Sequence, residues 1–580
     1  MQRAIGSAWR SCRHLLFEDR GNVAVIFGLT LAPVMLLVVL GVDYARIFAA
    51  RSNLQQATDA AALAVAKNIV DSTTGQQAQA QAQVYLANNA RGSISATAAT
   101  ISSDRMTFCL STRVQIMSAF SKLALNLAGV GALNASANAC AKMPGGLSPV
   151  DTYEIALVLD NSGSMSRSTN GMTKMQALQS AATSFVGTMF SRAPGRVQFA
   201  VTPFAGAVVA VDPTATANRS LSWIDVGGDN SQHWIAFGGK TAANAAGFTN
   251  RFGVYDKLAA RNSRLDWRGC FEALAYPYNV QDTATSSSNA ETLFVPYLAP
   301  DEPDSDDDYR NSYIDDDGAS YSWSWSSSVC SDTASGDWNK LEHVCKYKTT
   351  SSLSGSFGPT SFFGPNQFCP DNRTQAILQL NSTQSVVNDK INRLVENGNT
   401  NLHEGLMWGW RTISPVGPFA QGRAYGASGN HKVIVFMTDG FNNWGAQTRT
   451  VVGSDYEALG YYTYNGAANA RLPDGSAGDH VDYRSSLTAA AGSSSSYLSV
   501  SRAAQDELTL EACANAKAAG VEIYTIGFSI PADPIDEQGL ALLQACATNS
   551  SHYFAATDVA SLNAAFSTIG TGLGKLRLSQ

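Results

Sequence analysis

The sequence predicts an α/β fold with a doubly wound, mainly parallel sheet, and three observations support this. From residue 151 onward, apolar runs of strand length alternate with stretches of helix length. The run Val433–Met437 is almost entirely apolar, which is typical of a parallel strand covered on both faces. Polar residues follow two of the runs directly, at the strand ends where open α/β sheets bind ligands.

The elements of this sheet domain are expected in the following order. The expected strands are Tyr153–Leu159, Val197–Pro203, Val433–Met437, Val521–Phe528 and His552–Phe554. The expected helices are Met172–Ser191, Thr383–Glu396, Leu402–Thr412, Ser501–Ala519, Glu537–Cys546 and Val559–Leu573. Two long Gly- and Ser-rich stretches, at about 205–373 and 442–497, interrupt the alternation. Both follow strands, so we expect both insertions on the face that carries Asp160.

The N-terminal part predicts a membrane anchor. Residues 23–42 are predominantly apolar and contain no charged residue, which is long enough to cross a bilayer. A buried core helix is the alternative, but a helix of this length would normally show a polar stripe. Arginines precede the segment, which places the N-terminus in the cytoplasm and the bulk of the chain outside. The expected organisation is 1–22 cytoplasmic, 23–42 a single transmembrane helix, 43–143 a small α+β juxtamembrane region, 144–150 a linker, and 151–575 the sheet domain.

Cysteine use agrees with an exported chain. Eight of the nine cysteines lie beyond the apolar segment, and an oxidising compartment would allow four disulfides. The pairing stays open from sequence alone. Proximity favours Cys109–Cys140, Cys330–Cys345 and Cys513–Cys546, which leaves Cys270–Cys369.

The overall composition argues against a nucleic-acid partner. The 580 residues are 45% hydrophobic and only 15% charged, with a formal net charge of −7. Binding to DNA or RNA would require a basic face, and no basic run is present. The composition is compatible with a large core in two or more domains.

Three short segments together predict a metal site. Asp160-x-Ser162-x-Ser164 follows the first strand, Thr400 precedes a helix, and Asp439 follows the strand Val433–Met437. Each segment alone is more typical of a turn or a helix cap. All three in this order favour a site for Mg²⁺, with Ca²⁺ or Mn²⁺ as alternatives, because carboxylates and hydroxyls are hard oxygen ligands.

The proposed ligands also predict how such a site would act. Ser162, Ser164 and Thr400 would bind by hydroxyl, and Asp160 and Asp439 directly or through water. Two carboxylates and three neutral hydroxyls leave a coordination position for a carboxylate of a partner protein. Gly163 and Gly440 would let the backbone turn tightly beside the ion.

With these residues the chain resembles the von Willebrand factor type A domain. The metal-ion-dependent adhesion motif of that family matches DNSGSM at 160–165, Thr400 and Asp439. The resemblance covers about 150–205 and 374–575 and leaves the two insertions outside. It implies a metal-dependent, protein-binding domain whose ligands are the five residues named above.

The segment from Arg20 to Ala66 resembles the TadE/TadG-like proteins of bacterial Flp (tight-adherence) pilus assembly. The resemblance rests on the apolar segment, DYAR at 43–46 and LQQATDAAALAVA at 54–66. A type A domain behind such an anchor is the TadG-like arrangement. It implies an inner-membrane protein whose bulk is periplasmic and engages protein partners in pilus assembly or secretion.

Two binding functions are therefore expected and no enzymatic one. The first is a component of a pilus assembly or secretion apparatus; the alternative is a cell-surface adhesin that binds host or matrix ligands. The sequence lacks HExxH, and Gly239-Lys240-Thr241 lacks the first glycine of a P-loop, since Trp234 occupies that position. His403 is more typical of an ordinary helix residue than of a catalytic base.

Overall fold

The computed structural model describes most of the chain as two separate units. It describes residues 22–67, 69, 73–90, 92–102, 107–116, 133–142, 151–169, 171–304, 311–315, 336–348, 353, 364–370, 373–476, 481–490, 494–573 and 578–579. Unit 1 comprises Met1–Pro149 together with Leu573–Gln580, and unit 2 comprises Val150–Gly572. The sequence had assigned residues up to 575 to the sheet domain, whereas Leu573 and the residues after it belong to unit 1.

Unit 1 is a small α+β domain. Its helices are α2 (Asn22–Ala66) and α3 (Gly75–Asn89), and its antiparallel sheet has the order β1-β2-β3-β14. The strands are β1 (Ile94–Ile101), β2 (Thr107–Ile116), β3 (Leu133–Lys142) and β14 (Leu578–Ser579). Cys109 and Cys140 lie opposite each other on β2 and β3 and form a disulfide. Apolar residues of α2, α3 and the first three strands form its core.

Helix α2 contains the segment that was predicted to cross a membrane. Among the residues that could be searched, no helix combines the length and the apolar character that a membrane crossing requires. Most side chains of 23–42 lie outside the described residues, so the transmembrane segment stays a prediction. The same holds for the cytoplasmic N-terminus, because residues 1–21 lie outside the description.

Unit 2 is built on a six-stranded sheet with the order β13-β12-β9-β4-β7-β8. All neighbouring strands are parallel except β7 and β8, which pair antiparallel. The strands are β4 (Thr152–Asp160), β7 (Val197–Phe204), β8 (Leu378–Asn381), β9 (Asn430–Thr438), β12 (Glu522–Phe528) and β13 (Tyr553–Ala556). The mainly parallel α/β sheet is confirmed. Strand β8 was not predicted, because four residues at a sheet edge give almost no pattern.

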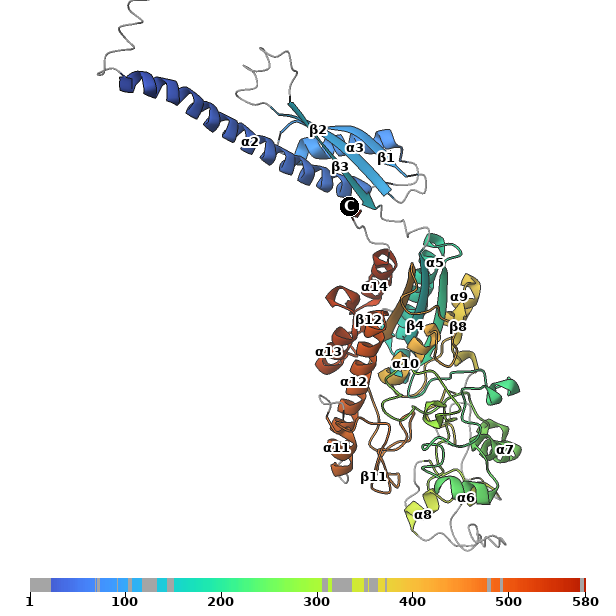
Figure 1. Cartoon of the computed structure of the whole chain (residues 1–580). Coiled ribbons are helices and arrows are strands. Elements are labelled where there is room, and N and C mark those ends of the chain that lie inside the picture. The colour runs from blue at the N-terminus through green and yellow to red at the C-terminus, as the bar shows by residue number, and fades with distance from the viewer. Residues whose placement is uncertain are drawn as a thin grey trace, which may run out of the picture. The chain divides into compact units, whose positions relative to one another are not determined.

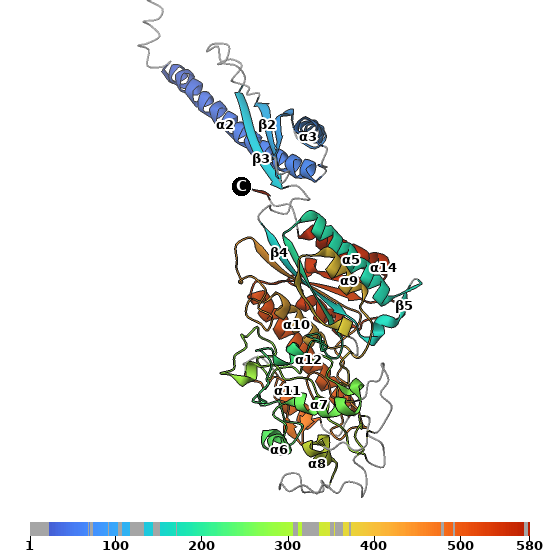
Figure 2. The same ribbon diagram turned by 90° about the vertical axis from the view of Figure 1, so that its right-hand side faces the viewer.

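Helices cover both faces of this sheet (Figures 1 and 2). One group, α5 (Lys174–Arg192), α9 (Gln384–Asn392) and α14 (Val559–Gly572), packs together. The other group is α10 (Leu402–Ile413), α12 (Ser494–Ala518) and α13 (Glu537–Cys546). Thr173 caps α5 with a reciprocal side-chain and backbone pair to Gln176. All six helices were predicted, most with ends that differ by a few residues; α12 begins at Ser494 and not at the predicted Ser501.

The two insertions fold against each other rather than as separate loops. The first contains α6 (Gly239–Ala246), α7 (Arg251–Arg261) and α8 (Asp337–Leu341), and the second contains the hairpin β10 (Thr463–Tyr464) with β11 (Ala467–Ala468) and α11 (Tyr483–Ala489). Backbone hydrogen bonds join them, from Ala273 N to Ala458 O (2.8 Å) and from Tyr276 N to Ala470 O (3.0 Å). Figure 1 shows these elements beyond the same end of the sheet.

A fully buried cluster of charges ties the two insertions together. The Glu272 carboxylate of the first insertion pairs with Arg251 of the same insertion and with Arg471 of the second, the latter at 2.5 Å. The Tyr456 hydroxyl donates to the same carboxylate. A buried carboxylate is tolerated when cations and hydroxyls satisfy it in this way. We call these four residues the insertion cluster.

The disulfides follow the pairing that sequence proximity favoured. Cys270–Cys369 and Cys513–Cys546 form in unit 2, in addition to Cys109–Cys140 in unit 1. Cys345 is also disulfide-bonded, and its predicted partner, Cys330, lies outside the described residues.

Candidate metal centre

Three loops of unit 2 meet at the carboxyl ends of β4 and β9. The strands are parallel neighbours, with Leu159 opposite Met437, so Asp160 and Asp439 emerge side by side. Gly163 N donates to Gly398 O (2.9 Å), and Asn443 N donates to Thr400 O (2.9 Å). The segment before α10 therefore bridges the other two loops. All five residues that the sequence singled out lie in this cluster of loops.

Hydrogen bonds connect four of these residues, one through a backbone amide and the others through side chains. Asp160 accepts from Ser162 N through Oδ1 (2.7 Å), and the Ser162 and Ser164 hydroxyls lie 3.1 Å apart. Ser164 Oγ donates to Asp439 Oδ1 (2.6 Å). The fifth residue, Thr400, lies near Gly440, where its Oγ1 is 3.5 Å from the position a Cβ would occupy. Hydroxyls and carboxylates thus converge on one small volume.

Glycines permit these close approaches, but not at the two positions expected from sequence. Neither Gly163 nor Gly440 has a positive φ, whereas Gly398 does, at +85°. A Cβ at Gly163 would lie 3.4 Å from the Gly398 carbonyl oxygen, which is an ordinary van der Waals contact. Gly398 therefore makes the tight turn, and neither the φ of Gly163 nor the space around it requires glycine.

The two carboxylates are buried close to each other. Asp160 is fully buried and Asp439 is 3% exposed. Burial, followed by repulsion from Asp439, raises the pKa of Asp160 to about 7. Hydrogen bonds from Ser162 and from the Thr438 hydroxyl (2.6 Å to Oδ2) oppose this rise. Two neighbouring buried carboxylates without enough positive charge are an environment that a divalent cation would relieve.

Lys174 and Asp533 belong to the same cluster and were missed from the sequence. Lys174, the first residue of α5, is fully buried, and its Nζ lies 2.7 Å from Asp439 Oδ2 and 2.7 Å from Asp533 Oδ2. Asp533 also pairs with Arg167, whose side chain is 58% exposed. A lysine in the first turn of a helix opposes the helix dipole, which is a sequence signal that could have drawn attention to it.

The donor set fits a hard divalent cation. The cluster offers carboxylate and hydroxyl oxygens, which Mg²⁺, Ca²⁺ and Mn²⁺ accept, and no thiol or imidazole. Within the described part of the chain, no group of three or more His, Cys, Asp or Glu residues could hold a metal. A site here would thus depend on the serine and threonine hydroxyls as well as the two aspartates.

The insertions cover one side of the cluster and leave another side open. Asn399, beside Thr400, donates to the buried Glu457 of the second insertion (2.7 Å). On the outer side, Gly163 is exposed, Ser164 is half-buried and Phe441 is 37% exposed. The cluster is therefore accessible along Gly163, Ser164 and Phe441, while the second insertion supports the loop that carries Thr400.

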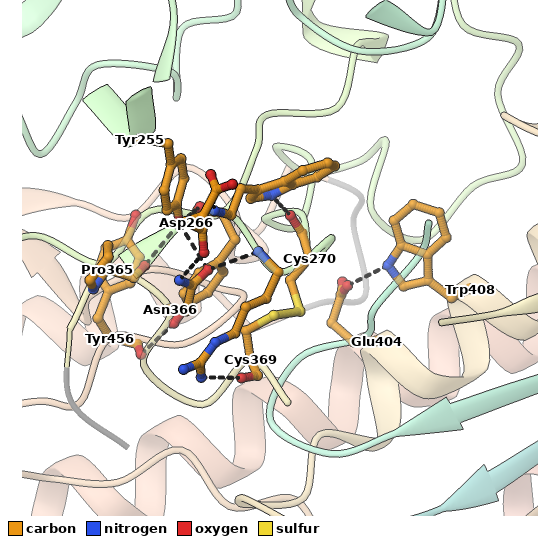
Figure 3. The surroundings of a disulfide bond; sticks show 12 residues. Tyr255, Asp266, Cys270, Pro365, Asn366, Cys369, Glu404, Trp408 and Tyr456 are labelled. Carbon is orange, nitrogen blue, oxygen red and sulfur yellow. Dashed lines mark hydrogen bonds between the residues drawn. A yellow bond between two sulfur atoms is a disulfide. The ribbon is translucent and has the colours of Figure 1, made fainter. Parts of the chain in front are cut away.

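A disulfide holds the first insertion next to this loop. Figure 3 shows the Cys270–Cys369 bond beside Asn366, which accepts from the Tyr255 hydroxyl (3.1 Å). Phe368, the residue before Cys369, has a positive φ of 59°. Its carbonyl oxygen lies 3.8 Å from the position of a Cβ at Gly398. The disulfide thus anchors a segment that contacts the turn before Thr400.

A family model matches only the N-terminal part of the chain. Residues 21–68 match the TadE/G-like Flp pilus-assembly family. No curated protein matches the chain in sequence.

Several solved structures are similar to the chain at low identity. One is the pilus adhesin SpaC from Lactobacillus rhamnosus GG in its open conformation, at 10% identity and a TM-score of 0.31, covering 83% of this chain and 33% of SpaC. Another is the PilB minor pilin from Streptococcus sanguinis, at 11% identity and a TM-score of 0.33, covering 84% of this chain and 80% of PilB. A third is the vWF domain of the type V pili tip protein Mfa5 from Porphyromonas gingivalis, at 12% identity and a TM-score of 0.29, covering 73% of this chain and 95% of that domain. This chain thus spans about a third of the length of SpaC. The family match, by contrast, lies entirely within unit 1.

Proposed function

We propose that this chain is a membrane-anchored, metal-dependent protein-binding component of a Flp/Tad-type pilus assembly or secretion apparatus. Its unit 2 acts as a von Willebrand factor A-like domain that holds Mg²⁺, or Ca²⁺ or Mn²⁺, through Asp160, Ser162, Ser164, Thr400 and Asp439. When bound, the ion offers a coordination position to a carboxylate of the partner protein. The observation that carries the proposal is the connected chain of hydroxyls and carboxylates at the ends of β4 and β9.

The placement in the cell rests on unit 1 and on the disulfides. The match of residues 21–68 to TadE/G-like proteins supports a pilus-assembly context. The disulfides Cys109–Cys140, Cys270–Cys369 and Cys513–Cys546 are compatible with an oxidising compartment. We therefore propose a single-pass inner-membrane protein with a cytoplasmic N-terminus and a periplasmic bulk. Recovery of the intact chain from the outer membrane or the medium would favour the adhesin alternative.

We propose binding rather than catalysis at this site. His403, the histidine nearest to Thr400 in sequence, is fully buried and hydrogen-bonds the backbone oxygen of Asn279 (2.7 Å). Burial lowers the pKa of His403 to about 4. A neutral histidine that is engaged elsewhere is poorly suited to act as a general base on a metal-bound water.

The test is ion binding and partner retention by the full-length chain. Titration calorimetry with Mg²⁺ should show one site in the wild type, and Asp160→Ala or Asp439→Ala should weaken it at least ~100-fold, because each removes a ligand. Pull-downs in Mg²⁺ should retain a partner that EDTA releases and that both variants fail to retain. Asp389→Ala, at an exposed aspartate of α9, is the control and should behave as the wild type. Equal retention in Mg²⁺ and EDTA would contradict the proposal.

A further inference from the structure

Lys174 has an unusual position for a lysine. Its side chain is fully buried, and its ammonium group contacts two carboxylates, each at 2.7 Å. It stands at the first position of α5, where the helix dipole disfavours a cation. Burial of an ammonium group costs free energy unless it is paired. The two aspartates, Asp439 and Asp533, therefore compensate for its burial and for the dipole.

The contacts divide the oxygens of Asp439 between two roles. Oδ2 accepts from Lys174, whereas Oδ1 accepts from Ser164, which is one of the proposed metal ligands. Lys174 thus fixes the orientation of the carboxylate and turns Oδ1 toward the hydroxyls. Asp533 holds the ammonium group from the other side and links the loop before α13 to the site.

The charges around the site are incompletely balanced. Asp160, Asp439 and Asp533 contribute three carboxylates, and Lys174 and Arg167 contribute two cations. Among the described residues, Asp160 has no basic partner; its oxygens accept from Ser162 N and the Thr438 hydroxyl. Lys174 therefore supplies a positive charge to Asp439, whereas Asp160, the other proposed metal-ligating carboxylate, has no paired cation among the described residues.

We propose that Lys174 is a tethered counter-cation of the metal centre, which neutralises Asp439 in the ion-free protein and lowers the affinity of the site for the incoming ion. The proposal rests on the proposed metal-binding function. A fixed positive charge a few ångströms from a bound cation repels it in proportion to the charge of that cation. Lys174 would thus keep the ion-free domain folded and make ion binding reversible. Asp533 moderates the repulsion by adding negative charge beside Lys174.

Two substitutions with opposite expected effects test the proposal. In the full-length protein, Lys174→Met removes the positive charge and should tighten Mg²⁺ binding about tenfold or more. Asp533→Asn removes the compensating negative charge and should weaken Mg²⁺ binding about fivefold. Asp389→Asn, remote from the site and 59% exposed, is the matched control and should leave the affinity unchanged.

A comparison of ions of different charge distinguishes the counter-cation role of Lys174 from a purely structural role. Tb³⁺ binding, followed by its luminescence, should tighten in Lys174→Met by a larger factor than Mg²⁺ binding. In EDTA, Lys174→Met should unfold at a lower temperature than the wild type, and saturating Mg²⁺ should close most of that gap. A purely structural lysine predicts weaker binding of both ions in both variants.

The outcomes distinguish the counter-cation role from the proposed function. If the wild type binds Mg²⁺ but Lys174→Met binds both ions more weakly, the counter-cation role is wrong and the proposed function stands. If the wild type binds neither ion but Lys174→Met binds both, repulsion by Lys174 is strong enough to prevent ion binding, which supports the counter-cation role. The same result would overturn the metal-dependent function of the wild type. If no variant binds either ion, both proposals fail. If Lys174→Met does not fold, Asp533→Asn alone tests the counter-cation role. Tighter or unchanged Mg²⁺ binding by Asp533→Asn would then overturn it.

Discussion

Two buried groups of charged side chains in unit 2 are balanced in opposite ways. In the insertion cluster, Glu272 has two arginines and a tyrosine hydroxyl around it, so both of its oxygens have strong partners. At the strand ends, Asp439 has Lys174, but the partners of Asp160 are a backbone amide and a neutral hydroxyl. The first group is complete by itself, as a structural cluster should be. The second keeps uncompensated negative charge, which is the property expected of a ligand site.

The largest expected effect comes from breaking the complete cluster. Glu272→Gln would leave Arg251 and Arg471 buried without a counter-charge, and losses of about 3–5 kcal/mol are typical of such a change. The free energy should be lost equally with and without Mg²⁺, because the cluster joins the insertions rather than the metal loops. Thermal unfolding of the full-length protein in both conditions measures this.

An exposed ion pair in the same insertion provides the control for that experiment. Arg219 pairs with Asp256, whose side chain is 67% exposed, and such pairs contribute about 1 kcal/mol or less. Asp256→Asn should therefore leave the unfolding temperature almost unchanged. A Glu272→Gln protein as stable as Asp256→Asn would show that the insertions do not depend on the buried charges.

Removal of a carboxylate from the group at the strand ends should stabilise the ion-free protein, whereas removal of the Glu272 carboxylate should destabilise it. Asp160 has a folded-state pKa of about 7 against an ordinary value of 3.8, because burial and Asp439 disfavour its charged form. The ion-free protein therefore has the full contribution of Asp160 to stability below about pH 4 and loses it as the pH rises to 7. Asp160→Asn cannot ionise, so above pH 7 it should be more stable than the wild type in EDTA, by about 2 kcal/mol after relaxation of the site.

Mg²⁺ should reverse this order of stabilities. The proposed ion would stabilise the wild type by binding the charged pair, whereas Asp160→Asn would lack one proposed ligand and gain little. Unfolding temperatures measured from pH 4 to pH 8, in EDTA and in Mg²⁺, separate the two effects. If Asp160→Asn is less stable than the wild type in EDTA at every pH, the two carboxylates do not repel each other as the geometry requires.

The residues at the strand ends could be predicted from the sequence. Asp160 and Asp439 follow apolar strands directly, and Thr400 precedes a helix, so local pattern and the rules of parallel sheets were enough to bring them together. Periodicity also predicted five of the six strands and the six covering helices along the chain, but not the order of the strands within the sheet. Lys174 was not predicted, because a lysine at the start of an amphipathic helix is normally exposed, although its position in the first turn was a signal.

The contacts between the two insertions could not be predicted from local sequence patterns. Glu272 and Arg471 are 199 positions apart, in stretches without regular periodicity. Their pairing depends on how two long loops pack, which neither residue reveals in its own neighbourhood. The strand β8 was missed for a related reason, because its four residues pair antiparallel at an edge and alternate too briefly to be recognised. Asp533 likewise reaches the proposed metal centre from a loop and not from a strand end.

The smallest expected effect concerns how far the insertions support the metal site. Replacing both Cys270 and Cys369 by serine should release the segment next to Phe368, which contacts the turn at Gly398. Substitution of a group that touches a metal ligand typically lowers metal affinity 10- to 100-fold. The segment at Phe368 lies one contact further from the proposed ligands. We therefore expect the double variant to bind Mg²⁺ roughly threefold more weakly. The matched control replaces Cys513 and Cys546, which join α12 to α13, and should lower the unfolding temperature without changing the affinity. Calorimetric titration of both double variants decides the matter. Equal affinities would mean that two hydrogen bonds hold the loop of Thr400, one from Asn399 to Glu457 and one from Asn443 N to Thr400 O. The first insertion would then contribute to stability alone.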